Sequence, residues 1–326
     1  MILSGLHLLW TYQCTYECDH CFAWGSPWQT GTMTLRKLAE ILDQGEALGT
    51  VEWIYFEGGE PFLYYGTLVR AVEMAAERGF QVGVVTNAYW ATDEDDAVQC
   101  LIPFKGLVHD LTISSDLFHS DETLSAQARV AREAAKRLGI EAGVITICDP
   151  RTVGVRSVEG QIPAGESGVM YKGRAVETLS SRAVKRSWEE FTECPHEDLR
   201  DPGRVHIDPL GNVHICQGLV IGNMFRTPLE AICRDYDPDR HPIIGPLLNG
   251  GPAELVRRYA VPHEEAYADA CHLCYEVRRA LRGRFPDMLA PDQMYGVMDQ
   301  GKSTGDGKKQ DEGRGANDDP AGEGCR

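Results

Sequence analysis

Three cysteines lie within eight residues near the start of the chain, in the segment CTYECDHC, as Cys14, Cys18 and Cys21. The first residues lack the basic region and cleavage site of a secretory signal, so we expect a cytoplasmic protein, where clustered thiols act as metal ligands or catalytic groups. Soft thiolates select iron-sulfur clusters or zinc. Three local sulfurs can hold a four-iron cluster whose fourth iron stays open, whereas a structural zinc completed by His20 satisfies the same spacing.

A second set of four cysteines is spread over three later pieces of the chain, as Cys194, Cys216, Cys271 and Cys274. A hairpin between the first two would bring them together, and the last two form a CxxC pair. Either a four-thiolate zinc site or a second iron-sulfur cluster fits this pattern. Cys233 is an alternative ligand, and His196, His214 and His272 are weaker alternatives. We expect no metal role for Cys100, Cys148 and Cys325, which have no close cysteine partner.

Composition limits the classes of function. The chain has 326 residues, of which 43% are hydrophobic and 25% charged, as in an ordinary globular protein. Its formal charge of −17 argues against general binding to nucleic acid or anionic lipid. No run approaches the roughly 18 apolar residues of a membrane helix.

Short β-rich runs alternate with helical periodicity from residue 5 to about 147, which predicts an α/β fold with a parallel sheet. The cysteine segment at 14–21 then lies on the loop after the first strand, at the mouth of the sheet where such folds place their sites. The expected strands are Leu6–Tyr12, Val51–Phe56, Gln81–Thr86, Leu107–Ser114 and Glu141–Ile147.

Capping residues predict two helices. Thr34 is expected to cap a helix that ends before Gly49. Ser120 is expected to open another that ends at Gly139, with Asp121 and Glu122 in its first turn, where acidic groups suit the helix dipole.

The regular alternation fails after Asp149. We expect a degenerate sixth strand within GVMYKGRAVE (168–177) and a hairpin in RVHIDPLGNVHIC (204–216) that turns at 209–212. The polar segment after Gln300 carries almost no apolar residues, which predicts a disordered tail. The predicted organisation is a partial (β/α)6 barrel at 1–187, a small cysteine-rich α+β domain at 188–298 and the tail at 299–326.

The C-x3-C-x2-C motif after the first strand resembles the radical S-adenosylmethionine superfamily, and the resemblance extends along the whole predicted barrel. It implies a 4Fe-4S cluster on Cys14, Cys18 and Cys21 whose open iron is chelated by S-adenosylmethionine. The EGGEP motif after the second strand matches the family's glycine-rich motif. The positions that the resemblance assigns to cofactor binding are His20, Phe22, Gly58, Gly59, Glu60, Asn87, Ser114, Asp116 and Arg174.

The second cysteine set resembles the auxiliary-cluster domains of that family, and its four ligands match the shorter Twitch form rather than the longer SPASM form. The resemblance implies a second 4Fe-4S cluster on Cys194, Cys216, Cys271 and Cys274. It also implies reduction by a partner such as flavodoxin or ferredoxin, cleavage to a 5'-deoxyadenosyl radical, and hydrogen abstraction from a small molecule or peptide.

His119 is the candidate general base, because it would face the mouth of the sheet. The outcome would be oxidation or formation of a C-S or C-C bond. A different class, a non-catalytic iron-sulfur electron carrier or a zinc-stabilised binding module, also stays open. The EGGEP motif and Ser114-Ser115-Asp116 argue against it, since a carrier has no need of cofactor-chelating groups.

Overall fold

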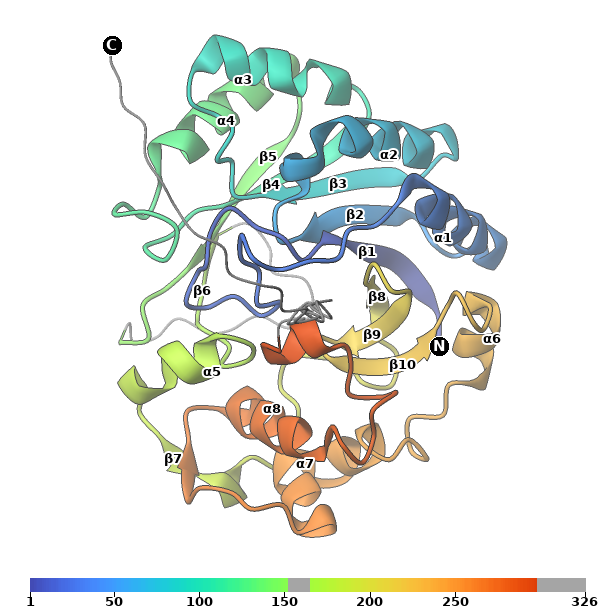
Figure 1. The fold of residues 1–326 in the computed structure, drawn as a ribbon, viewed down its shortest axis with the longest axis vertical. Helices are drawn as coiled ribbons and strands as arrows, with labels where there is room; N and C mark the ends of the chain where they lie inside the picture. Colours follow the sequence, from blue (N-terminus) through green and yellow to red (C-terminus); the bar gives the residue numbers. More distant parts are fainter. Residues whose placement is uncertain (152–164, 298–326) are drawn as a thin grey trace, which may run out of the picture.

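The computed structural model describes residues 1–151 and 165–297, whose strands form one large sheet and one two-stranded ribbon (Figure 1). The large sheet has the order β10-β9-β8-β1-β2-β3-β4-β5-β6. Its strands are β1 Leu3–Thr11, β2 Trp53–Gly58, β3 Gln81–Thr86, β4 Val108–Ser114, β5 Ala142–Ile147, β6 Gly165–Ser167, β8 Gly203–Ile207, β9 Asn212–Cys216 and β10 Leu219–Asn223. The ribbon pairs β7 Arg186–Ser187 with β11 Ala266–Tyr267.

Helices connect and cover these strands. The α-helices are α1 Leu35–Leu48, α2 Tyr65–Glu77, α3 Glu94–Leu101, α4 Ala126–Leu138, α5 Ala175–Thr178, α6 Leu229–Asp235, α7 Ile244–Tyr259 and α8 Ala270–Leu281. Short 3-10 helices are η1 Pro61–Tyr64, η2 Ile102–Phe104, η3 Ser180–Arg182, η4 Trp188–Glu190 and η5 Asp292–Tyr295. Within the described ranges, no helix is both long and apolar enough to cross a membrane.

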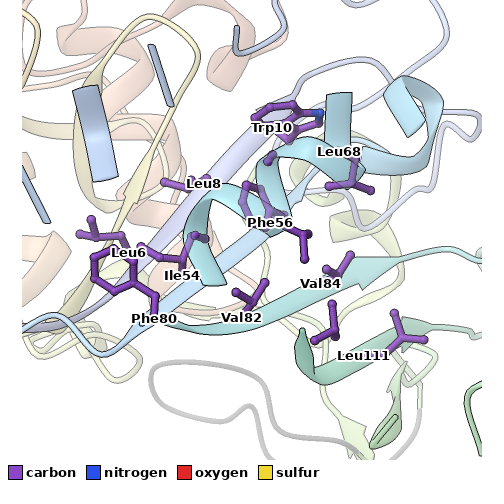
Figure 2. Packing of buried hydrophobic residues seen from close by; sticks show 14 of the residues in the cluster. Leu6, Leu8, Trp10, Ile54, Phe56, Leu68, Phe80, Val82, Val84 and Leu111 are labelled. Carbon is purple, nitrogen blue, oxygen red and sulfur yellow. The ribbon is translucent and has the colours of Figure 1, made fainter. Parts of the chain in front are cut away.

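The strands β1 to β6 are parallel neighbours in chain order, which confirms the predicted parallel sheet. Four of the five expected strands shift by one to three residues at one or both ends, and the third, Gln81–Thr86, is as predicted. Side chains alternate across each strand. In β1, Leu6, Leu8 and Trp10 therefore share the face that packs against the helices (Figure 2). His7 points to the opposite face, into the interior of the partial barrel.

The predicted start and end are confirmed for the first helix, and for the second the end at Gly139 is confirmed and the start is wrong. Thr34 accepts a hydrogen bond from the Lys37 amide, and Gly49 ends α1 with a φ of 68°. The helix α4 instead begins after Ser125, whose hydroxyl accepts from the Ala128 amide. Ser120 therefore lies in the loop before α4, because the Ser115 hydroxyl accepts from the Ser125 amide and fixes the helix start there.

The sixth strand also differs from its predicted position. It is Gly165–Ser167, paired with β5, and residues 168–174 form no strand. The predicted strand region turns away because Gly173 adopts a φ of +62° and the Arg174 amide donates to the Cys21 carbonyl. The segment thereby contacts the first cysteine loop.

The C-terminal part continues the same sheet. The strand β8 is parallel to β1, and the predicted hairpin is confirmed, with β8 and β9 antiparallel and His206 opposite His214. The sheet thus includes strands on both sides of residue 187. The division into two domains at that residue stays a prediction. A second apolar core joins β9 and β10 to α7 and α8. The predicted tail at 299–326 lies outside the described residues.

Candidate active site

One cavity opens at the carboxyl ends of the parallel strands, and we call it the barrel cavity. All three residues of the first cysteine set line it, together with side chains from β1 to β5 and from β8. Its other lining residues among those predicted as site residues are His20, Phe22, Gly58, Gly59, Asn87, Ser114, Asp116 and His119. The fold therefore assembles residues that lie more than 100 positions apart in the sequence.

The first cysteine loop is held by its own main chain. The Cys14 amide donates to the Ser26 carbonyl at 3.0 Å, and the Gly25 amide donates to the Cys21 sulfur at 3.2 Å. Burial raises the pKa of the Cys14 thiol to about 12 and raises that of Cys18 further. Thiols packed together this way ionise only beside a positive centre, so the donor set fits a metal cluster.

Arg174 fastens this loop. Its guanidinium donates to the carbonyls of Cys18 and Gly25, at 2.8 Å each. A Cβ at Gly173 would lie 2.5 Å from the Cys21 carbonyl oxygen, so glycine permits the close approach. Arg174 does not line the barrel cavity, and its predicted contact with a cofactor stays a prediction.

The EGGEP motif also packs tightly against the cysteine loop. A Cβ at Gly59 would lie 2.0 Å from the Gln13 carbonyl oxygen, which leaves room for glycine alone. Glu60 is fully buried, and its carboxylate accepts from the Phe62 amide, the Thr86 hydroxyl and the Asn87 amide. Burial raises the pKa of Glu60 to about 7. Its carboxylate thus joins the ends of β2 and β3. Glu60 does not line the barrel cavity, and its predicted contact with the cofactor stays a prediction.

Asn87 links these strand ends to the cysteine loop. Its side-chain amide donates to the Thr15 hydroxyl at 3.0 Å and lies 3.5 Å from the Cys14 sulfur. Ser114 lines the cavity at the end of β4. Both residues are therefore placed where the sequence predicted them, at the mouth.

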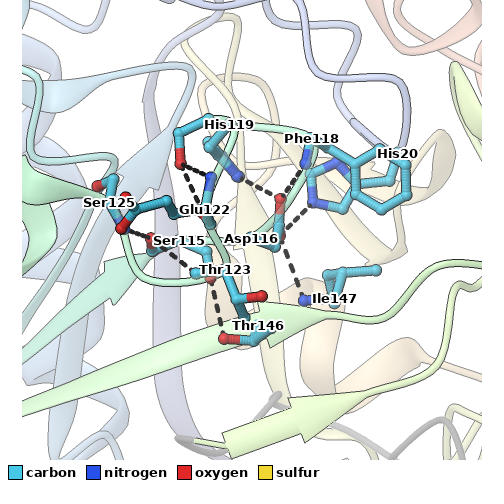
Figure 3. Close-up of polar contacts among 11 residues, drawn as sticks. His20, Ser115, Asp116, Phe118, His119, Glu122, Thr123, Ser125, Thr146 and Ile147 are labelled. Atoms are coloured by element: carbon cyan, nitrogen blue, oxygen red, sulfur yellow. Dashed lines mark hydrogen bonds and ion pairs between the residues drawn. The ribbon is translucent and has the colours of Figure 1, made fainter.

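Asp116 organises the opposite wall between two histidines (Figure 3). Its carboxylate lies 3.1 Å from His20 Nε2 and 2.8 Å from His119 Nδ1, and it accepts from the Phe118 and Ile147 amides. Burial raises the pKa of Asp116, but these partners outweigh it and hold the pKa well below its usual range. His20 stacks on Phe118 with ring centroids 4.8 Å apart, which fixes the orientation of the His20 ring at the cavity wall.

Several polar residues of the barrel cavity were not predicted as site residues, among them His7, Glu57, Lys172 and His206. Each is buried or nearly so. The available signal was a histidine inside an otherwise apolar strand, as in GLHLLW and RVHID. Buried polar groups of this kind need partners, which sequence alone does not supply.

The second cysteine set is also brought together. Each of Cys194, Cys271 and Cys274 has its thiol pKa raised, mainly by burial and further by other cysteines of the set. Cys194, Cys216 and Cys274 border the second core. Cys233 belongs to the first core, where its carbonyl accepts from the N-terminal amine, so it lies apart from this set.

Comparison with known proteins defines the class. Residues 8–148 match the model of the radical SAM superfamily, so this part of the chain is a radical SAM domain, which implies a 4Fe-4S cluster and S-adenosylmethionine. The curated relatives include the putative peptide biosynthesis protein YydG of Bacillus subtilis, 27% identical over 38% of this chain and 40% of the relative. An S-adenosylmethionine-dependent nucleotide dehydratase of Fibrobacter sp. is 28% identical over 38% of this chain and 35% of the relative.

Among solved structures, Streptococcus suis SuiB bound to its precursor peptide SuiA has a TM-score of 0.51 at 13% identity. The match covers 83% of this chain and 76% of SuiB, and it supports the fold alone. The chain matches 40% or less of the length of the two curated relatives named above.

Proposed function

We propose that the protein is a radical S-adenosylmethionine enzyme that abstracts hydrogen from a peptide or small-molecule substrate with the help of an auxiliary iron-sulfur cluster. The observation that carries the proposal is the lining of the barrel cavity. Three buried thiols on one loop face the same space as Asn87, Ser114 and Asp116. A cluster that only transferred electrons would have no use for such polar walls.

Cys14, Cys18 and Cys21 would hold the first cluster, and Ser114 and Asn87 would bind polar groups of S-adenosylmethionine. When bound, these cofactors supply one-electron cleavage to a 5'-deoxyadenosyl radical, which takes hydrogen from an unactivated C–H bond. His20 lines the cavity, and its stacking on Phe118 holds its ring as a planar surface for the adenine. Asp116 orients both His20 and His119, which keeps His119 a candidate base at the cavity wall.

The auxiliary cluster would be held by Cys194, Cys216, Cys271 and Cys274. Two buried cations support an anionic group there, because Lys172 and Arg278 interact electrostatically with the thiols of this set. The Lys172 ammonium also lines the barrel cavity, so the second cysteine set and the cavity share a wall. The cluster would accept an electron from the substrate radical or help to bind the substrate, and a flavodoxin or ferredoxin would reduce the first cluster.

The substrate class follows less directly. A peptide is supported by YydG, named for peptide biosynthesis. A small molecule is supported by the nucleotide dehydratase. A peptide-modifying maturase that relies on a separate recognition protein therefore remains an alternative form of the same proposal.

The test is mass-spectrometric detection of 5'-deoxyadenosine after anaerobic reconstitution, reduction with dithionite and addition of S-adenosylmethionine. We expect slow formation by the wild type and none by Cys18→Ala. Cys271→Ala with Cys274→Ala should retain some formation, since the second set is outside the radical SAM domain. Cys100→Ala, a cysteine outside both sets, is the matched control and should behave as wild type. No product from a fully loaded, reduced wild type would favour the electron-carrier alternative.

A further inference from the structure

Three neighbouring strands place two histidines and a carboxylate on one face of the sheet. His7 in β1 and His206 in β8 are register partners. In β2, Glu57 lies two residues after Tyr55, the register partner of His7. Because side chains alternate along a strand, all three point into the barrel cavity, which they line.

Their polar atoms converge. His7 Nδ1 lies 3.2 Å from Glu57 Oε2, and His206 Nε2 lies 3.0 Å from Glu57 Oε1. One ligand atom from each residue falls within 4.8 Å of the other two. The three side chains are only 4%, 13% and 6% exposed, in the order His7, Glu57 and His206.

Hydrogen bonds account for part of this geometry. His7 Nδ1 and Glu57 Oε2 form a hydrogen bond, and His206 Nε2 forms a close polar contact with Glu57 Oε1. His206 Nδ1 is buried without a hydrogen-bond partner among the described residues. A buried polar atom without a partner, in a group of converging ligand atoms, is a place where a bound ion is expected.

The nearby cations pair with another carboxylate, which leaves that of Glu57 able to bind a metal ion. Lys172 and Arg204 lie near Glu197, with nitrogen-oxygen distances of 3.9 and 3.3 Å, so Glu197 is the carboxylate that pairs with these two cations. His7 is held in place by stacking on Tyr55, with ring centroids 4.7 Å apart.

We propose that His7, Glu57 and His206 bind a divalent first-row transition cation of the Zn²⁺ or Fe²⁺ type, separate from both cysteine sets. Two imidazoles with one carboxylate form a ligand set that such cations prefer, and it leaves coordination positions open. Those positions face the barrel cavity. The site does not depend on the proposed radical chemistry, because its ligands include no cysteine.

The test uses the anaerobically reconstituted protein with its clusters oxidised, one equivalent of Zn²⁺ and a desalting step. Elemental analysis should find about one retained zinc per chain. X-ray absorption at the zinc edge should give a nitrogen and oxygen shell at about 2.0 to 2.1 Å, without the sulfur shell at about 2.3 Å that a cysteine site would give. A sulfur shell, or no retained zinc, would overturn the proposal.

Variants locate the zinc. Glu57→Gln and His206→Asn should each weaken zinc binding by at least about a hundredfold, since each removes a ligand. His263→Asn removes an exposed imidazole elsewhere and is the matched control, with unchanged binding. Iron content and cluster absorbance report whether each variant is folded. If Glu57→Gln does not fold, His206→Asn and the wild-type zinc spectrum decide, and equal retention by folded His206→Asn and wild type refutes the site.

Discussion

Replacing Arg174 should release the first cysteine loop. Its guanidinium makes two buried hydrogen bonds of 2.8 Å to main-chain carbonyls of that loop. Hydrogen bonds to a charged group contribute about 1.5 to 3 kcal/mol each, so Arg174→Met should lose about 3 to 6 kcal/mol of loop stabilisation. A lysine ammonium lacks the planar fork that reaches both carbonyls, so Arg174→Lys should lose about half as much, or roughly ten- to a hundredfold in cluster affinity.

The assay is iron and sulfide content after anaerobic reconstitution, before any S-adenosylmethionine is added. We expect Arg174→Met to lose the iron that Cys18→Ala loses, and Arg174→Lys to lose part of it. Arg137→Met is the control, because Arg137 is half-exposed and its ion pairs lie at the surface, where water screens them. If both Arg174 variants keep wild-type iron and only bind S-adenosylmethionine more weakly, Arg174 acts on the cofactor and the reasoning fails.

Three further substitutions test how buried contacts stabilise the fold, with the free energy of unfolding measured by chemical denaturation. Burial raises the pKa of Asp208, but His214 and other partners outweigh burial and hold that pKa below its usual value. The contribution of Asp208 to the free energy of unfolding should therefore be complete above pH of about 4 and be lost as the pH falls further. Asp208→Asn should remove this acid dependence and lower the free energy of unfolding by about 3 to 5 kcal/mol. Gly173→Ala should destabilise strongly, because its Cβ would meet a carbonyl oxygen at 2.5 Å, whereas Gly66→Ala in α2 meets nothing and should be neutral or stabilising. Glu60→Gln should cost about 1.5 to 3 kcal/mol, since an amide nitrogen would replace one acceptor of its buried network.

Local sequence patterns were enough to predict the elements whose determinants are themselves local. The helix Leu35–Leu48 carries its own caps at Thr34 and Gly49, so its bounds follow from nearby residues. The start of α4 depends instead on Ser115, ten residues before its cap at Ser125, and Ser120 is an equally good cap by type. A capping preference alone cannot choose between two serines.

The candidate site also has one part that local motifs predict and another that depends on contacts between distant parts of the chain. The cysteine spacing and the EGGEP motif place several cavity residues correctly, because each follows directly on a strand end. Glu60 accepts hydrogen bonds from Thr86 and Asn87 at the end of another strand, and Arg174 donates to main-chain carbonyls of the cysteine loop; no local pattern encodes these long-range contacts. The pairing of His7 with His206 depends on β8 lying beside β1, across about 200 residues of sequence.

That same pairing has a consequence for synthesis of the chain on the ribosome. β1 lies inside the sheet, between β2 and β8, yet β8 is made roughly 200 residues after it. At about 5 to 20 residues per second, the edge of β1 that faces β8 waits roughly 10 to 40 s for its partner. An apolar strand with an open edge is a template for pairing with other chains. A nascent chain, or a fragment ending near residue 187, would therefore be prone to aggregate through its first strand.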